Sequence, residues 1–222
     1  MPPGLGLLTV GELLDGEKPG LRERKKLRTR ATLIDAAVEL CLTHGYENTT
    51  VEQIAAVAEV SPRTFSRYFA TKDAVIMTLL DDLVASVAVE LSAIPASVPV
   101  FEALHLAHVN VLREVSKGTV PGLTHERIVL MLRIINSTPA LKSAATDFRP
   151  IPTVRALADR MGTGLDDRRM WMVMSVWSAI IVTACGDLVV DRVGQELGPD
   201  LMVTRLEEMF ADFTELTAQL TH

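Results

Sequence analysis

The sequence predicts an all-α protein of nine or ten helices. Almost no segment has the strict apolar–polar alternation of a half-buried strand, whereas apolar residues recur every three or four positions from residue 21 onward. Gly and Pro residues interrupt this pattern at intervals that suit helix ends. The chain has 222 residues, of which 48% are hydrophobic, so it can bury a sizeable core and is not disordered as a whole.

The first helix is expected over about residues 22–43, because its apolar residues share one helical face. They are Leu27, Ala31, Ile34, Ala37, Val38, Cys41 and Leu42. Gly45 ends this helix, since glycine adopts a left-handed conformation at low cost. Thr50 and Gln53 have the spacing of a capping box, which predicts a second, short helix that ends near Ala58.

A third short helix is expected from Pro62 to about Phe69, with Ser61 as its N-cap. Thr71 begins a fourth, long helix that Pro95 terminates. The remaining helices are predicted over residues 100–117, 123–136, 139–148, 153–161, 166–193 and 199–220. The apolar part of residues 170–190 is shorter than the roughly 20 residues that a bilayer needs, so a buried helix and no membrane contact are expected there.

The second and third helices, joined by residues 58–60 and backed by the first, form a helix-turn-helix arrangement. Phe65 and Phe69 are four residues apart and must face inward, which turns Arg63 and Arg67 outward. Arginine is well matched to the guanine acceptors in the major groove. A purely structural three-helix unit without DNA is the alternative.

The formal net charge of −6 is unusual for a DNA-binding protein. The positive charge is concentrated between Leu21 and Arg30, where basic residues heavily outnumber the single Glu23. Such a patch can attract phosphates although the rest of the chain is acidic.

The stretch GYENTTVEQIAAVAEVSPRTFSRYFATKDAV resembles the DNA-binding signature of the TetR family of transcriptional regulators, and the similarity covers about residues 30–76. The resemblance implies an N-terminal helix-turn-helix domain and a C-terminal helical domain for ligand binding and dimerisation. It implies phosphate contacts from Thr50, Thr64, Tyr68 and Lys72, and base contacts from Pro62, Arg63, Ser66 and Arg67. The basic segment with Arg28 and Arg30 would be an arm that approaches the DNA backbone or minor groove.

Two positions depart from the family pattern. Glu59 stands in the turn where Gly is usual, and a left-handed Glu costs about 1 kcal/mol. Ser66 stands where a larger aromatic residue is frequent, which affects the base readout.

The expected organisation is a flexible tail over residues 1–20, a DNA-binding domain over residues 21–70 and a ligand-binding and dimerisation domain over residues 71–222. The start of the chain lacks a cationic segment before its apolar stretch, so no secretory signal is expected. Cys41 and Cys185 lie far apart and form no CxxC pair, which favours a reducing, cytoplasmic setting.

A ligand pocket is predicted between the helices over residues 100–117, 123–136 and 166–184, where polar residues interrupt apolar runs. The candidate wall residues are His105, His108, Asn110, Arg133, Asn136, Trp171, Met174 and Trp177. This composition favours a long lipophilic effector over a sugar or nucleotide. A fainter resemblance to TetR regulators that sense acyl chains or acyl-CoA points the same way. Plain core packing explains at least half of the Met and Trp residues equally well.

Metal and enzyme chemistry are not expected. His105 and His108 are three residues apart on one helix, but no Cys or carboxylate completes a ligand set, so no metal or other cofactor is predicted. The sequence contains no nucleophile elbow, phosphate loop or recognisable carboxylate pair.

The function predicted is that of a regulator that binds double-stranded DNA, a repressor that a small lipophilic effector releases from a palindromic operator. Two half-sites need two recognition helices about 34 Å apart, so one copy per chain requires a homodimer, and the last two helices are its expected interface. Two alternatives remain open: a dimeric DNA-binding protein without small-molecule sensing, and a small-molecule-binding protein that has lost operator binding. The effector, the operator and the sign of regulation are not readable from the sequence.

Overall fold

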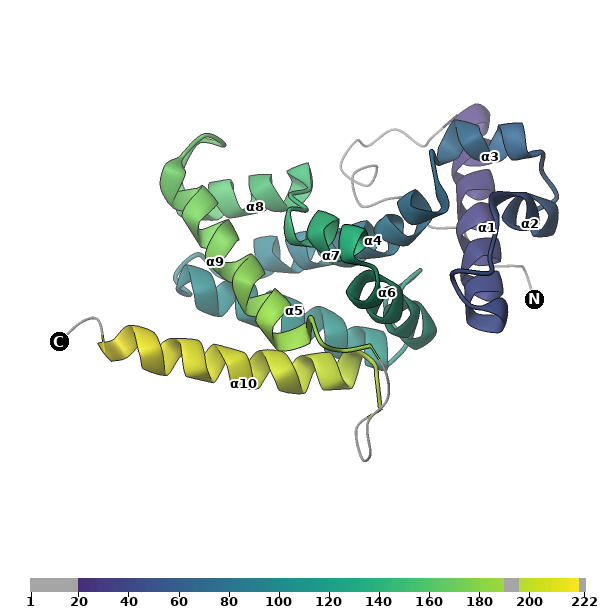
Figure 1. Ribbon diagram of the computed structural model, residues 1–222. Helices are drawn as coiled ribbons and strands as arrows, with labels where there is room; N and C mark the ends of the chain where they lie inside the picture. The colour runs from purple at the N-terminus through teal and green to yellow at the C-terminus, as the bar shows by residue number, and fades with distance from the viewer. Residues whose placement is uncertain (1–19, 190–195, 220–222) are drawn as a thin grey trace. The chain divides into compact units, whose positions relative to one another are not determined.

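The computed structural model describes residues 20–189 and 196–219, and within them it contains ten α-helices and no strand (Figure 1). The prediction of an all-α fold is therefore confirmed. These residues form two compact units, one up to Leu79 and one from Leu80 onward. Among the described helices, none combines the length and the hydropathy needed to cross a membrane. The predicted tail lies outside the described residues except for Gly20.

The first unit consists of three helices and the first turns of a fourth. They are α1 (Leu21–His44), α2 (Val51–Val57), α3 (Pro62–Tyr68) and the beginning of α4 (Lys72–Ala93). Leu33, Ile54, Phe65 and Val75 are completely buried in its core. Each such side chain stabilises the folded unit by roughly 1.5–3 kcal/mol relative to an exposed position.

The two short helices begin at the caps that the sequence predicts. Thr50 Oγ1 accepts the amide proton of Gln53 at 3.3 Å, and the Thr50 amide donates to Gln53 Oε1 at 2.8 Å. Ser61 Oγ accepts the Thr64 amide at 3.1 Å, and Pro62 occupies the first position of α3. These local hydrogen bonds satisfy amide groups that helix geometry leaves unpaired. Their partners are only three residues apart, which explains why the sequence alone predicted where both short helices begin.

The turn between α2 and α3 contains Glu59 in the left-handed region, with φ of 54°. It is the one non-glycine residue with positive φ among the described residues. The Val60 amide donates to Ala55 O at 2.9 Å, which closes the turn behind it. The helix-turn-helix geometry is thus kept despite the absence of glycine, at a conformational cost.

The second unit comprises the rest of α4 and six further helices. They are α5 (Val100–Ser116), α6 (His125–Ser137), α7 (Pro139–Thr146), α8 (Ile151–Met161), α9 (Arg168–Cys185) and α10 (Pro199–Ala218). Figure 1 shows α10, in yellow, running along α5 and α9. The apolar stripe of α10 lies against these neighbours, because Met202, Val203 and Leu206 are buried.

Helix α9 is shorter than the helix predicted over residues 166–193, and this part of the prediction is wrong. It ends at Cys185, and residues 190–193 lie outside the described residues. Asn136 Nδ2 donates to the carbonyl oxygens of Cys185 and Leu188, both at 2.9 Å, and Lys142 Nζ donates to Gly186 O at 2.6 Å. Side chains from α6 and α7 therefore satisfy the carbonyls at this helix end, whereas periodicity reports only that the apolar run continues.

We predict that Glu59→Gly stabilises the protein by about 0.5–1 kcal/mol, because glycine adopts positive φ without the penalty of a Cβ atom. Urea denaturation followed by circular dichroism measures the change. Glu52→Gly is the matched control: Glu52 lies in the first turn of α2 with ordinary helical geometry, so glycine there costs about 1 kcal/mol. Equal losses of stability in both variants would contradict the prediction.

Candidate DNA interface and candidate ligand cavity

Helix α3 has one buried face and one exposed face. Phe65 is fully buried, Phe69 follows it at the helix end with ring centroids 5.7 Å apart, and both contribute to the core. The side chains on the other face are exposed: Pro62, Arg63, Ser66 and Arg67. Thr64 and Tyr68 are half-buried at its edge. The four candidates for base contacts therefore share one accessible surface.

An open groove lies between the first turns of α1 and α3 within the first unit. It is lined by Arg22, Glu23, Lys25, Lys26, Thr29, Val60, Thr64, Arg67 and Tyr68. Four of these residues are cationic, and the single acid, Glu23, is paired with Lys26 at 3.3 Å. The groove can therefore bind a polyanion such as a nucleic-acid backbone.

The basic segment is the beginning of α1 rather than an arm that precedes the first helix, which corrects the sequence interpretation. Arg22, Lys25, Lys26 and Thr29 recur at helical spacing, and this face of α1 meets the groove. This helical spacing was present in the sequence. An extended arm would not place these residues on one face, so the interpretation as an arm did not predict the groove. Arg28 is exposed elsewhere on α1 and does not line the groove.

Two of the other predicted DNA contacts have partners inside the first unit. Arg30 Nη2 lies 3.5 Å from Thr78 Oγ1, with its guanidinium 5.6 Å from the centre of the Phe69 ring. Thr50 is exposed, although its side chain also caps α2. Arg30 therefore packs against the core side of α3, where a phosphate cannot displace it without loss of these contacts.

Lys72 at the start of α4 holds the loop between α1 and α2. Its ammonium donates to Tyr46 O at 2.7 Å and to Thr49 O at 3.2 Å, and it lies 4.1 Å from the centre of the Tyr46 ring. The Tyr46 hydroxyl in turn donates to Asp73. Burial and this carboxylate both raise the pKa of Tyr46, so the phenol stays protonated. Lys72 is thus a positioning residue, with one ammonium proton left for a phosphate.

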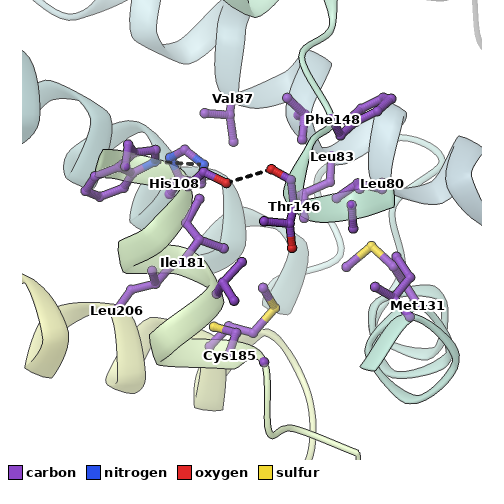
Figure 2. Close-up of a pocket in the computed structure, with 18 of the residues that line it drawn as sticks. Leu80, Leu83, Val87, His108, Met131, Thr146, Phe148, Ile181, Cys185 and Leu206 are labelled. Atoms are coloured by element: carbon purple, nitrogen blue, oxygen red, sulfur yellow. Dashed lines mark hydrogen bonds between the residues drawn. The ribbon is translucent and has the colours of Figure 1, made fainter. Parts of the chain in front are cut away.

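The second unit contains a cavity of about 170 Å³ that is partly open to solvent. Figure 2 shows the labelled side chains converging on it from α4 (Leu80, Leu83, Val87), α5 (His108), α6 (Met131), α7 and the residues after it (Thr146, Phe148), α9 (Ile181, Cys185) and α10 (Leu206). Most of the wall is apolar, which suits a small molecule with little hydrogen-bonding capacity.

Four of the eight predicted wall residues line this cavity: His108, Asn136, Met174 and Trp177. The other four do not. His105 stacks on Phe210 with ring centroids 4.3 Å apart, and Asn110 donates to Glu90 at 2.8 Å. Arg133 is exposed, and Trp171 is 38% exposed and donates to Leu165 O.

Two parts of the cavity wall were not predicted from the sequence. They are the apolar side chains of α4 and the polar residues Lys142, Thr146 and Arg149 of α7 and the segment after it. These groups come from segments far apart in the chain. No local spacing brings them together, so only the tertiary packing could have identified them.

His108 is held in one neutral form. His108 Nδ1 lies 2.8 Å from Leu104 O, and because a carbonyl oxygen can only accept a hydrogen bond, Nδ1 carries the proton. Nε2 accepts a hydrogen bond from Trp177 Nε1 at 3.4 Å. Burial lowers the pKa of His108 to about 4, although part of its ring faces the cavity. The imidazole is therefore uncharged at neutral pH. Among the described residues, no group of three or more His, Cys, Asp or Glu side chains could hold a metal ion.

Comparisons with known proteins identify one family in the N-terminal part. Residues 33–77 match the family model described as bacterial regulatory proteins, tetR family. The HTH-type transcriptional regulator TcmR of Streptomyces glaucescens is 38% identical over 169 residues, which cover 73% of this chain and 74% of that protein.

Solved structures of helical regulators are more distant. A transcriptional regulator of Aquifex aeolicus is 15% identical, with a TM-score of 0.46, over 83% of this chain and 99% of its own. Thermus thermophilus FadR, solved in complex with lauroyl-CoA, is 22% identical, with a TM-score of 0.47, over 82% of this chain and 93% of its own. At this level of similarity the ligand of one protein does not identify the ligand of another.

We predict that His108 makes the folded state lose stability as the pH falls. Because the pKa of His108 is about 4 in the folded state and near 6.5 in the unfolded chain, protonation favours unfolding between these two values. The stabilising contribution of neutral His108 to the free energy of unfolding is complete above about pH 6.5. It decreases by up to roughly 3 kcal/mol as the pH falls to about 4. Urea denaturation at several pH values should show a shallower dependence for His108→Gln and His108→Phe than for the wild type, and an unchanged dependence in both variants would contradict the prediction.

Proposed function

The chain belongs to the TetR family of bacterial regulatory proteins, and we propose that it is a repressor which leaves a palindromic operator when a small apolar molecule fills the cavity of its second unit. Regulators of this family are DNA-binding transcription factors rather than enzymes. The observation that carries the proposal is the presence, in one chain, of an exposed basic recognition helix and a largely apolar cavity.

The DNA-binding half of the proposal assigns two roles. Arg63, Ser66 and Arg67 on the exposed face of α3 read base edges in the major groove. The cations that α1 contributes to the groove, Arg22, Lys25 and Lys26, hold phosphate oxygens and fix the register of α3. Thr64 and Tyr68 lie at the boundary of the two surfaces and suit phosphate contacts.

TetR regulators dimerise, and we place the interface on the outer faces of α9 and α10. The exposed side chains on α9 include Met172, Ser175, Ala179 and Thr183, and those on α10 include Thr204, Ala211 and Leu216 together with the acids Glu208, Asp212 and Glu215. Phe210 and Phe213 of α10 are half-buried against His105 and Phe101 of their own chain, so they do not belong to these outer faces. Pairing of these faces in two chains would form a four-helix bundle.

The cavity sets the size of the effector. Its volume of about 170 Å³ is close to the roughly 150 Å³ of an engineered apolar cavity that binds benzene. A molecule of about ten heavy atoms therefore fits without expansion, whereas a long acyl chain requires the wall to move. This size range is narrower than the long lipophilic effector that the composition suggested.

Helix α4 provides the route from effector to DNA. Its first turns bury Val75 and Ile76 in the core of the first unit, and its later residues Leu83 and Val87 line the cavity. A ligand that favours a different position of α4 would shift the population between DNA-binding and released dimers. A DNA-binding protein without sensing is the alternative, and a largely apolar cavity of this size favours the sensor.

We predict that Arg63→Ala and Arg67→Ala each weaken binding to the operator by about 1–3 kcal/mol and leave binding to scrambled DNA almost unchanged. Lys25→Ala should weaken both DNAs alike and reduce the slope of log K against log salt by about 1. Fluorescence anisotropy with matched and scrambled duplexes at several salt concentrations measures both effects. Lys117→Ala, an exposed lysine of the second unit, is the control. Equal losses on both DNAs for all three interface variants would show that the reading residues are misassigned.

We predict that octan-1-ol, an apolar molecule of suitable size, raises the melting temperature and releases operator DNA, because a ligand that binds the folded state stabilises it by mass action. Ile181→Trp is the matched variant, since the larger ring occupies part of the cavity and should abolish both effects. Thermal unfolding gives the first readout and anisotropy of labelled operator the second. An unchanged melting temperature and intact DNA complex across a panel of apolar molecules of this size would remove the sensing function and leave DNA binding intact.

A further inference from the structure

We propose that the effector carries one anionic group, such as a carboxylate, that Lys142 and Arg149 bind at the α7 side of the cavity. This inference rests on the proposed function, because it assumes that the cavity holds a small molecule. It adds the chemical class of that molecule and names the two residues that recognise it.

The first observation is the charge of the cavity wall. Lys142 and Arg149 both line the cavity, and no Asp or Glu does. Neither cation has a carboxylate partner in an ion pair among the described residues. His108, the other titratable nitrogen base in the wall, is neutral, so the wall carries an uncompensated positive charge at neutral pH.

The second observation is that both cations are held in place but keep free donors. Lys142 Nζ uses one proton on Gly186 O at 2.6 Å, which leaves two. Arg149 Nη1 donates to Thr146 O at 2.7 Å and to Phe148 O at 2.9 Å, which leaves the protons on Nη2 and Nε. Backbone carbonyls thus orient the two groups without neutralising them.

The third observation is the polarity of the surroundings. Figure 2 shows Leu83, Val87 and Ile181 around the same space that Thr146 of α7 borders. A neutral ligand would remove water from two cations and offer them no counter-charge, which is costly. A carboxylate accepts charge-assisted hydrogen bonds from both, while its apolar body lies against the remaining wall.

The test compares octanoate with octanamide, which have nearly the same shape and differ in charge. The protein carries Trp171→Phe, so that the fluorescence of Trp177 in the cavity wall reports binding. At pH 7.5 we expect octanoate to bind at least about tenfold more tightly than octanamide, as charge-assisted hydrogen bonds imply. Lys142→Gln and Arg149→Gln should each reduce this preference to about twofold, and Lys142→Arg should keep it. Lys117→Gln, outside the cavity, should match the wild type.

The outcomes separate the inference from the function on which it rests. Equal affinities for octanoate and octanamide, or an unchanged preference in both glutamine variants with wild-type circular dichroism, would overturn the anionic effector and leave an apolar sensor. Failure of octanoate, octanamide and octan-1-ol alike would overturn the proposed function as well. Loss of the preference in Lys142→Gln together with its retention in Lys142→Arg supports the inference.

Discussion

The burial of one face of α4 is the constraint on which the rest of the structure depends. Val75 and Leu79 belong to the core of the first unit, and Leu83, Val87 and Leu91 continue the same stripe in the second. One amphipathic helix therefore contributes to two cores, and any change in its rotation alters the packing of both. Side-chain hydrogen bonds hold both of its ends.

At its first turn, Lys72 and Asp73 hold the loop after α1 through Tyr46, as described above. After its last turn, Arg160 of α8 donates to the carbonyl oxygens of Ile94, Pro95 and Val98 at 2.9, 2.8 and 2.6 Å. Lys72 thus binds backbone carbonyls of the loop between α1 and α2, and Arg160 binds backbone carbonyls of the segment that follows α4. The cavity lies along the part of α4 between these attachments, so a ligand there acts on the helix segment that links them.

The sequence predicted the elements whose limits depend on neighbouring residues. The capping box of Thr50 and the cap formed by Ser61 involve partners three residues away, so reading the sequence was sufficient. The end of α9 depends on Asn136 and Lys142, which lie more than 40 residues away in the chain, so no local pattern predicts it. The candidate site divides in the same way. The exposed face of α3 followed from helical spacing. Only half of the predicted wall residues line the cavity, because much of the actual wall comes from α4, α7 and α10, which local spacing does not connect.

The distribution of charge explains how an acidic chain can recognise anions. The net charge of −6 repels a polyanion at long range, but at physiological salt the Debye length is about 8 Å, so only nearby charges act strongly. In the first unit the cations of α1 and α3 line one groove, and in the second the half-buried Lys142 and Arg149 line a cavity whose wall is largely apolar. DNA binding depends strongly on salt because several phosphates are neutralised and their counterions are released, whereas an effector with one charge in a largely apolar cavity depends on salt much less. Raising the salt concentration should therefore weaken DNA binding far more than it weakens the binding of an anionic effector, which allows the two affinities to be measured separately in one protein.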